Sequence, residues 1–169
     1  MVEKMDIAFA SFDKTLATKF MECISTEKCP VKKIAFENCR FKFDALRIVM
    51  QAIKLNKSIK SLKIKSVVLH EKDAMTIADM LRAKQTLSEL TLSFCGLDDA
   101  GIIQIASSLA VCQQLKYLDL RSNCFEVQGL HSVMDALLQV SSCKTLMLED
   151  IEVDEEQAIH SLKKLLDDR

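Results

Sequence analysis

The sequence predicts an α/β solenoid, in which short strands and helices alternate along one axis. Three observations support this fold class. The chain of 169 residues matches itself at a step of 28 residues without a gap. Each unit opens with apolar residues at the alternating spacing of a half-buried strand, and it continues with apolar residues three and four apart, which is typical of an amphipathic helix. Such units bury their apolar faces only by stacking on one another, so we expect a right-handed superhelix with a concave parallel sheet and convex helices.

Five aligned segments carry the strand pattern, and they begin at Val31, Ile59, Leu87, Leu115 and Cys143. The third segment shows the spacing clearly. Its expected core positions are Leu87, Leu90, Leu92, Cys95 and Leu97. We therefore expect a single domain over residues 1–169, with four regular repeats over residues 31–142.

The two ends of the chain are predicted to be capping repeats. Residues 1–30 form a degenerate first repeat, in which Ile7, Phe9 and Phe12 echo the first regular unit at a step of 27. This alignment predicts Phe9 and Phe12 in the core of the cap, whereas Phe43 falls at a position that is acidic in other units.

Residues 143–169 are the predicted C-terminal cap. Asp154 precedes Gln157 in an arrangement that resembles a capping box and so indicates the start of a last helix. The inward stripe of that helix is predicted to be Ala158, Leu162, Leu165 and Leu166.

The spacing LxxLxLxxN/CxL in these units resembles the ribonuclease-inhibitor-like leucine-rich-repeat family. The segment TIADMLRAKQTLSELTL is also similar to the repeats of tropomodulins and Ran GTPase-activating proteins. The resemblance implies an intracellular protein that works by holding other proteins. Two units depart from the pattern, because Val67 and Ile151 replace the Asn or Cys that bonds the turn backbone.

Composition excludes several classes of function. The net charge is −1, and no apolar run is long enough for a membrane span, so we expect a cytoplasmic or nuclear location and no general affinity for nucleic acid. The seven cysteines are odd in number and lack metal-ligand spacing, so the sequence predicts neither disulfides nor a metal site, and it indicates no cofactor.

Catalytic groups are not expected either. The histidines His70, His131 and His160 fall at unrelated repeat positions, and Asp98 and Asp99 stand where a helix cap and a first-turn acid are expected. Cys39 and Cys95 occupy the turn position of the repeat and are predicted to be buried. We therefore do not expect an enzyme.

The outward side chains of the strands are the predicted binding surface, because side chains alternate across a sheet and the inward set is already assigned. An aromatic residue and an arginine on a rigid sheet are types that are enriched at binding hot spots. The predicted partner-binding residues are Lys63, Lys65, Glu89, Thr91, Phe94, Tyr117, Asp119, Arg121 and Met147.

The sequence thus favours a non-enzymatic adaptor, or a subunit of a larger assembly, that docks another protein on its concave sheet. One alternative is a regulator of a GTPase or a cytoskeletal protein, for which Arg40 and Arg121 are the available arginines. A second alternative is a binder of RNA or anionic lipid through the basic residues in 31–65, since the chain is basic there and acidic toward its end.

Overall fold

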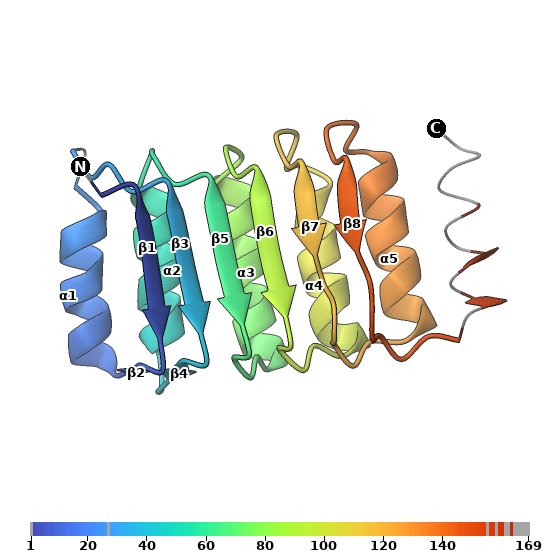
Figure 1. The fold of residues 1–169 in the computed structure, drawn as a ribbon, viewed down its shortest axis with the longest axis horizontal. Helices are drawn as coiled ribbons and strands as arrows, with labels where there is room; N and C mark the ends of the chain where they lie inside the picture. Colours follow the sequence, from blue (N-terminus) through green and yellow to red (C-terminus); the bar gives the residue numbers. More distant parts are fainter. Residues whose placement is uncertain (1, 27, 155, 158, 161–162, 164–169) are drawn as a thin grey trace.

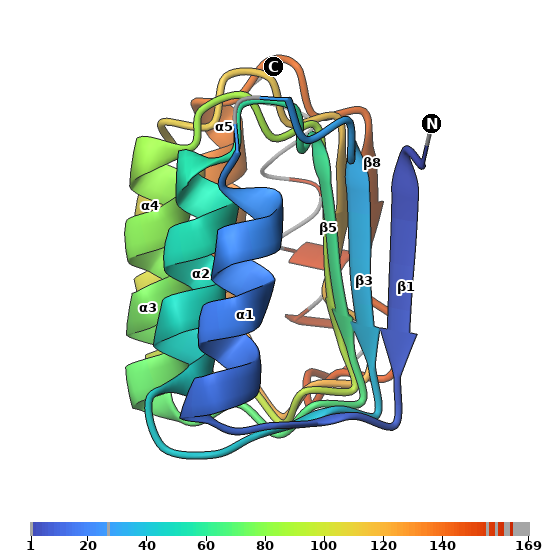
Figure 2. The same cartoon turned by 90° about the vertical axis from the view of Figure 1, so that its left-hand side faces the viewer.

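The computed structural model describes residues 2–26, 28–154, 156–157, 159–160 and 163. Strands and helices alternate along the chain and form two layers, with the sheet on one side and the helices packed against its other side (Figures 1 and 2). Consecutive units lie side by side in space, as a solenoid requires. The predicted α/β solenoid is therefore confirmed.

One parallel sheet contains the longer strands in chain order, β1-β3-β5-β6-β7-β8. Its strands are β1 (Lys4–Ala8), β3 (Lys33–Glu37), β5 (Ser61–Lys65), β6 (Glu89–Ser93), β7 (Tyr117–Asp119) and β8 (Thr145–Met147). The strands β2 (Ser11–Phe12) and β4 (Arg40–Phe41) pair separately at the end where β1 and β3 finish. The helices are α1 (Lys14–Ile24), α2 (Ala45–Leu55), α3 (Glu71–Ala83), α4 (Asp99–Leu109) and α5 (Val127–Leu138).

The strand register from β3 onward has the predicted step of 28. Leu62 pairs with Leu90, and Leu90 pairs with Leu118. These residues and the inward faces of the helices form one continuous apolar core. Because every unit contributes the same positions, the core extends along the whole sheet.

The N-terminal strand has a different register from the one that the sequence suggested. Ile7 pairs with Phe36 and Phe12 with Phe41, which is a step of 29 and not of 27. Phe12 is buried as predicted, but Phe9 is 83% exposed, so its assignment to the cap core was wrong. The two steps differ by two residues, which leaves the alternation of faces unchanged and makes them hard to separate from the pattern alone.

The turn that follows β7 is tied by one buried amide. The Asn123 side chain donates to the carbonyls of Leu92 and Leu120 at 2.7 and 2.8 Å. Its oxygen accepts from the backbone N–H groups of Cys95 and Leu97 at 3.1 and 3.2 Å. Asn123 therefore satisfies the polar groups of two successive turns, which is the function that the repeat pattern assigns to this position.

The turn-position cysteines are buried, as predicted. Cys95 Sγ donates to the Ser93 carbonyl at 3.3 Å, and burial raises the pKa of this thiol to about 12. Cys39 is also buried and bonds the Ile7 carbonyl at 3.4 Å. Cys112, which lies at the end of its repeat, has a pKa raised by burial to about 11. All three side chains are packed as small apolar groups, and the raised pKa values keep the thiols of Cys95 and Cys112 protonated at neutral pH.

The acid pair at the start of α4, Asp98 and Asp99, caps two helices. Asp98 accepts from the backbone N–H of Gly101 at 2.9 Å at the start of α4. Asp99 reaches the next repeat and accepts from Glu126 N and Gly129 N at the start of α5, at 2.9 and 2.8 Å. A Cβ at Gly129 would lie 2.6 Å from Asp99 Oδ1. The pair is thus structural, and glycine at position 129 allows the cap to cross between repeats.

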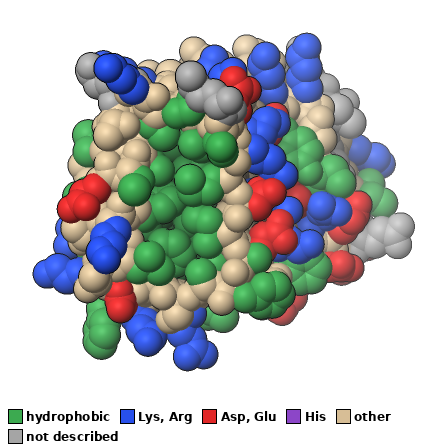
Figure 3. All heavy atoms as spheres, turned by 60° about the vertical axis from the view of Figure 1, so that its left-hand side comes forward, with side chains coloured by type: hydrophobic (Ala, Val, Ile, Leu, Met, Phe, Trp, Pro, Cys, Tyr) green, Lys and Arg blue, Asp and Glu red, His purple; other side chains and the backbone are tan. Residues whose placement is uncertain are grey.

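The two ends of the solenoid differ in what the structure describes. At the start, half-buried Met5, Ile7, Ala10 and Met21 pack against the core, and apolar side chains gather into one patch on this end (Figure 3). At the other end, the Asp154 carboxylate accepts from Gln157 N at 2.9 Å, in agreement with a helix start. The predicted inward residues of the last helix, Ala158, Leu162, Leu165 and Leu166, lie outside the described residues.

Within the described part of the chain, no helix has both the length and the apolar character that a bilayer crossing needs. The same part of the chain contains no group of three or more His, Cys, Asp or Glu side chains that could hold a metal ion.

Candidate functional site

The outward residues of the strands form columns across the sheet, in the register that the repeat predicts. Glu89 pairs with Tyr117, and Thr91 pairs with Asp119. Met147 continues the second column on β8. The side chains of these columns are therefore fixed side by side on a surface whose backbone is held by its hydrogen-bonded neighbours.

A hollow of about 480 Å³ lies at the carboxyl ends of β5, β6 and β7. It brings together seven of the nine predicted site residues. These are Lys63, Lys65, Thr91, Phe94, Tyr117, Asp119 and Arg121. Glu89 lines a neighbouring hollow with Tyr117, while Met147 lies beside Asp119 on β8 and lines neither.

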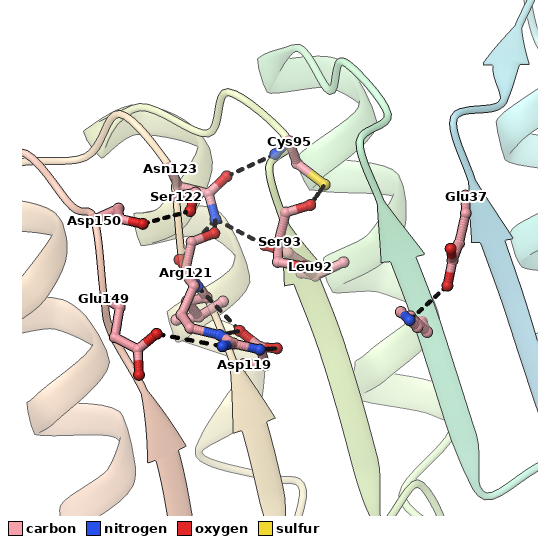
Figure 4. A network of polar contacts seen from close by, with 12 residues as sticks. Glu37, Leu92, Ser93, Cys95, Asp119, Arg121, Ser122, Asn123, Glu149 and Asp150 are labelled. Atoms are coloured by element: carbon pink, nitrogen blue, oxygen red, sulfur yellow. Dashed lines mark hydrogen bonds and ion pairs between the residues drawn. The ribbon is translucent and has the colours of Figure 1, made fainter.

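Arg121 is the most constrained side chain at the hollow (Figure 4). Its Nε and Nη2 donate to the two carboxylate oxygens of Asp119 at 3.0 and 2.9 Å, and Nη1 donates to Glu149 at 3.3 Å. Its backbone N–H also donates to Asp119 at 3.1 Å. The guanidinium plane is therefore held in one orientation before any ligand arrives.

Asp119 lies under this arginine and is only 3% exposed. Burial by itself raises the pKa of its carboxyl, but the hydrogen bonds and charge of Arg121, with a hydrogen bond from Tyr117, together outweigh burial and hold the pKa below the ordinary value. The same carboxylate raises the pKa of Arg121. Asp119 was predicted as an outward contact residue; in the structure its carboxylate positions Arg121 instead of facing solvent.

Phe94 forms the apolar wall of the hollow. It is 53% exposed, and the Lys65 ammonium lies 5.5 Å from the centre of its ring, within cation–π range. Its φ of 56° is in the left-handed region, which a bulky side chain rarely adopts. Asn38, Ser66 and Ser122 have the same conformation at this position of the repeat, so the bend belongs to the fold and projects Phe94 outward.

The hollow has one basic and one acidic side. Lys63 and Lys65 come from β5, whereas Glu149 and Asp150 come from the segment after β8. Lys63 is paired with Glu37 of β3 at 2.5 Å, as Figure 4 shows. Phe94, which follows β6, and Tyr117 of β7 lie between these two sides.

Two acidic residues of the hollow were not among the predicted site residues. Glu149 bonds Arg121, and Asp150 accepts from the Ser122 hydroxyl at 3.3 Å. In both pairs the partners are 28 residues apart and so occupy equivalent positions in successive repeats. The repeat step was therefore the signal that could have found them.

Comparisons with known proteins agree with the repeat pattern. A family model described as Leucine Rich repeat matches residues 83–106 and 111–134. A relative in Bos taurus, "NACHT, LRR and PYD domains-containing protein 5", is 32% identical over 131 residues. The match covers 77% of this chain, and it spans only 11% of the length of that relative.

A similar fold is found among solved structures. The C-terminal domain of tropomodulin from Caenorhabditis elegans superimposes with a TM-score of 0.74, over 90% of this chain and 92% of that chain. The sequences are 14% identical, so this likeness concerns the fold alone.

Proposed function

Because the chain belongs to the leucine-rich-repeat family, whose domains are protein-interaction modules, we propose that it is a non-enzymatic adaptor or assembly subunit that docks a partner protein on its concave sheet. The observation that carries this proposal is the hollow where Phe94 and Tyr117 lie beside the pre-positioned guanidinium of Arg121. Aromatic and arginine side chains on a rigid surface give large contact area with little loss of conformational entropy on binding.

The charges of the hollow suggest the kind of segment that it binds. Lys65 favours a carboxylate at one side and Asp150 favours a basic group at the other, whereas Lys63 and Glu149 are already paired with Glu37 and Arg121. An extended protein segment with an acidic residue, an apolar residue and a basic residue in that order would match both sides and the Phe94 ring. Both contacts are attractive ion pairs on an exposed surface, so we expect added salt to weaken binding.

Two alternatives have weaker support. A GTPase regulator with an arginine finger needs a free guanidinium, and that of Arg121 is engaged by two carboxylates, which leaves the exposed Arg40. A binder of RNA or anionic lipid needs basic side chains that are not already in ion pairs. Lys32 and Lys33 are paired with Glu3 and Glu89 at 2.6 and 3.0 Å. These ion pairs reduce the positive electrostatic potential that would attract a polyanion to this surface.

The proposal is tested by affinity capture from cells that express the protein, with three forms of bait and quantitative mass spectrometry. The double variant Phe94→Ala, Tyr117→Ala removes the concave aromatics. The matched control, Met75→Ala, Ile103→Ala, removes two exposed apolar side chains from the convex helices α3 and α4.

We expect the wild type and the convex control to retain the same partner, and the concave variant to lose it. For the purified partner, the loss should be at least about 2 kcal/mol, or about thirtyfold in Kd. Retention by the concave variant together with loss by the convex control would place the binding surface on the helices and overturn the proposal.

A further inference from the structure

Strand β1 forms an open edge of the six-stranded sheet. Glu3 O accepts from Lys33 N at 3.1 Å, and Phe9 N donates to Glu37 O at 3.0 Å, so alternate residues from 3 to 9 direct their peptide groups toward β3. The peptide groups of Lys4, Asp6 and Ala8 therefore face away from the sheet. The strand sequence KMDIA contains no proline or bulge, and its two charged residues, Lys4 and Asp6, have opposite signs, so they do not exclude a second copy as a row of like charges would.

The end of the core beside this edge is apolar. Met5 and Ile7 point inward from β1 and remain half-buried, because they pack against a repeat on one side only. Met21 of α1 is half-buried in the same way. Figure 3 shows apolar side chains gathered into one patch on this end of the solenoid. A contiguous apolar patch next to an unpaired strand edge is typical of an interaction surface.

The outward face of β1 is complementary to itself. Lys4 and Asp6 are two residues apart and form an ion pair at 2.7 Å, with more than half of each side chain exposed. In an antiparallel pairing of two β1 strands that is centred on Met5, Lys4 of each copy lies opposite Asp6 of the other. Lys4 and Asp6 are also the residues whose peptide groups face the open edge, so each such pair exchanges two backbone hydrogen bonds.

We propose that two copies of the chain associate through their β1 strands, antiparallel and about a twofold axis through Met5. The sheet then continues from one copy into the next, and the two apolar ends cover each other on the helix side of the sheet. Met5 meets Met5 of the second copy, and Val2, which is exposed in the single chain, lies opposite Ala8. An interface of this kind is isologous and closes at two copies.

Other registers are less favourable. A shift that centres the pairing on Asp6 places two like charges opposite each other, and one that centres it on Lys4 does the same with two lysines. The concave sheet from β5 to β8 stays open in the dimer. This proposal therefore does not depend on the docking function, and either can fail without the other.

Sedimentation velocity over a wide range of protein concentration tests the dimer through a charge exchange. The Lys4→Asp variant presents only carboxylates on the outward face of β1, and the Asp6→Lys variant presents only ammonium groups. Each variant alone should be a monomer where the wild type is a dimer, with the dissociation constant raised at least tenfold. An equimolar mixture of the two variants should form a heterodimer, because every facing pair is then of opposite sign.

The control is Thr145→Lys on β8, at the opposite edge of the sheet. It should leave the dimer unchanged. A wild type that sediments as a monomer throughout, or a mixture of variants that stays monomeric, overturns the proposal. If Thr145→Lys weakens assembly and the species grow beyond two copies, the contact runs from β1 to β8 and the twofold arrangement is wrong.

Discussion

The guanidinium group of Arg121 lies against the carboxylate of Asp119, which is almost fully buried beneath it, with donor distances of 3.0 and 2.9 Å. A buried carboxylate that loses its cationic partner keeps the cost of its desolvation. Considered only as an outward residue of a strand, Arg121 would be expected to tolerate replacement without loss of stability. The structure indicates that the fold and the binding surface both depend on it.

We therefore expect Arg121→Glu to lower the urea midpoint of unfolding, since it places a second carboxylate against Asp119. Glu149→Gln should have a smaller effect, because Glu149 is an exposed partner of the same guanidinium. A double-mutant cycle of Arg121→Gln and Asp119→Asn, neither of which adds a charge, measures the pair, and it should show coupling between positions 119 and 121. Additive effects in the cycle would mean that the pair does not stabilise the fold.

The turn amide of Asn123 gives a second prediction. Asn123→Ala leaves two buried N–H groups and the carbonyls of Leu92 and Leu120 without this partner. The free energy of unfolding should fall by about 2 to 4 kcal/mol. This loss is large for a single substitution, because several buried groups lose a hydrogen bond at once. Val67, at the same repeat position, has no such bonds. Val67→Ala serves as a control that loses packing only.

The core leucines test the register of the repeat. Leu92 and Leu120 are fully buried between neighbouring units. Replacing either with Ala should lower the free energy of unfolding by about 2 to 5 kcal/mol, through lost transfer energy and the cavity that remains. Chemical denaturation of the wild type and of each variant measures this loss. A loss below about 1 kcal/mol at both positions would contradict the assignment of these residues to the core.

Stability should fall at alkaline pH because of the buried thiols. Burial raises the pKa of Cys95 to about 12 and that of Cys112 to about 11, from an ordinary value of 9.0. Above pH 9, the unfolded chain releases these two protons while the native chain keeps them, so the free energy of unfolding decreases as pH rises. This contribution is complete below pH 9 and is lost toward the native pKa values.

Lys84 changes the pH dependence of stability in the opposite direction to the thiols. Its ammonium group donates to the Asn56 carbonyl in a buried setting, and burial lowers its pKa from 10.5 to about 8. Between these values the native chain releases a proton that the unfolded chain keeps, so this group adds stability as pH rises. With two thiols against one amine, the net loss from pH 9 to 10 should be about 1 kcal/mol.

Urea unfolding at a series of pH values measures this balance. Lys84→Met should make the alkaline loss steeper, and Cys95→Ala should make it shallower. In Lys84→Met, which lacks the opposing amine, a stability that stays constant or rises between pH 9 and 10 would show that the thiols ionise equally in both states.

The repeat predicted the sheet well because each strand position recurs at a fixed step of 28 and side chains alternate between two faces. It placed Phe9 wrongly, since shifting one irregular strand by two residues preserves that alternation. It also could not show that the Asp119 carboxylate is buried and bonded to Arg121, because the alternation assigns only the face of a side chain and not its partners. The repeat also could not show that Asp99 caps α5, because this contact depends on the distance between two neighbouring repeats in space.

The docking of a protein partner on the concave sheet is the central claim, and hydroxyl-radical footprinting of the purified complex tests it most directly. Phe94 and Tyr117 report on the concave hollow, and exposed Met75 and Phe43 report on the convex helix α3 and on the edge of the solenoid. If the claim is right, oxidation of Phe94 and Tyr117 falls several-fold on binding, while Met75 and Phe43 react as in the free protein. Unchanged oxidation of Phe94 and Tyr117, with protection of Met75 or Phe43, would contradict it.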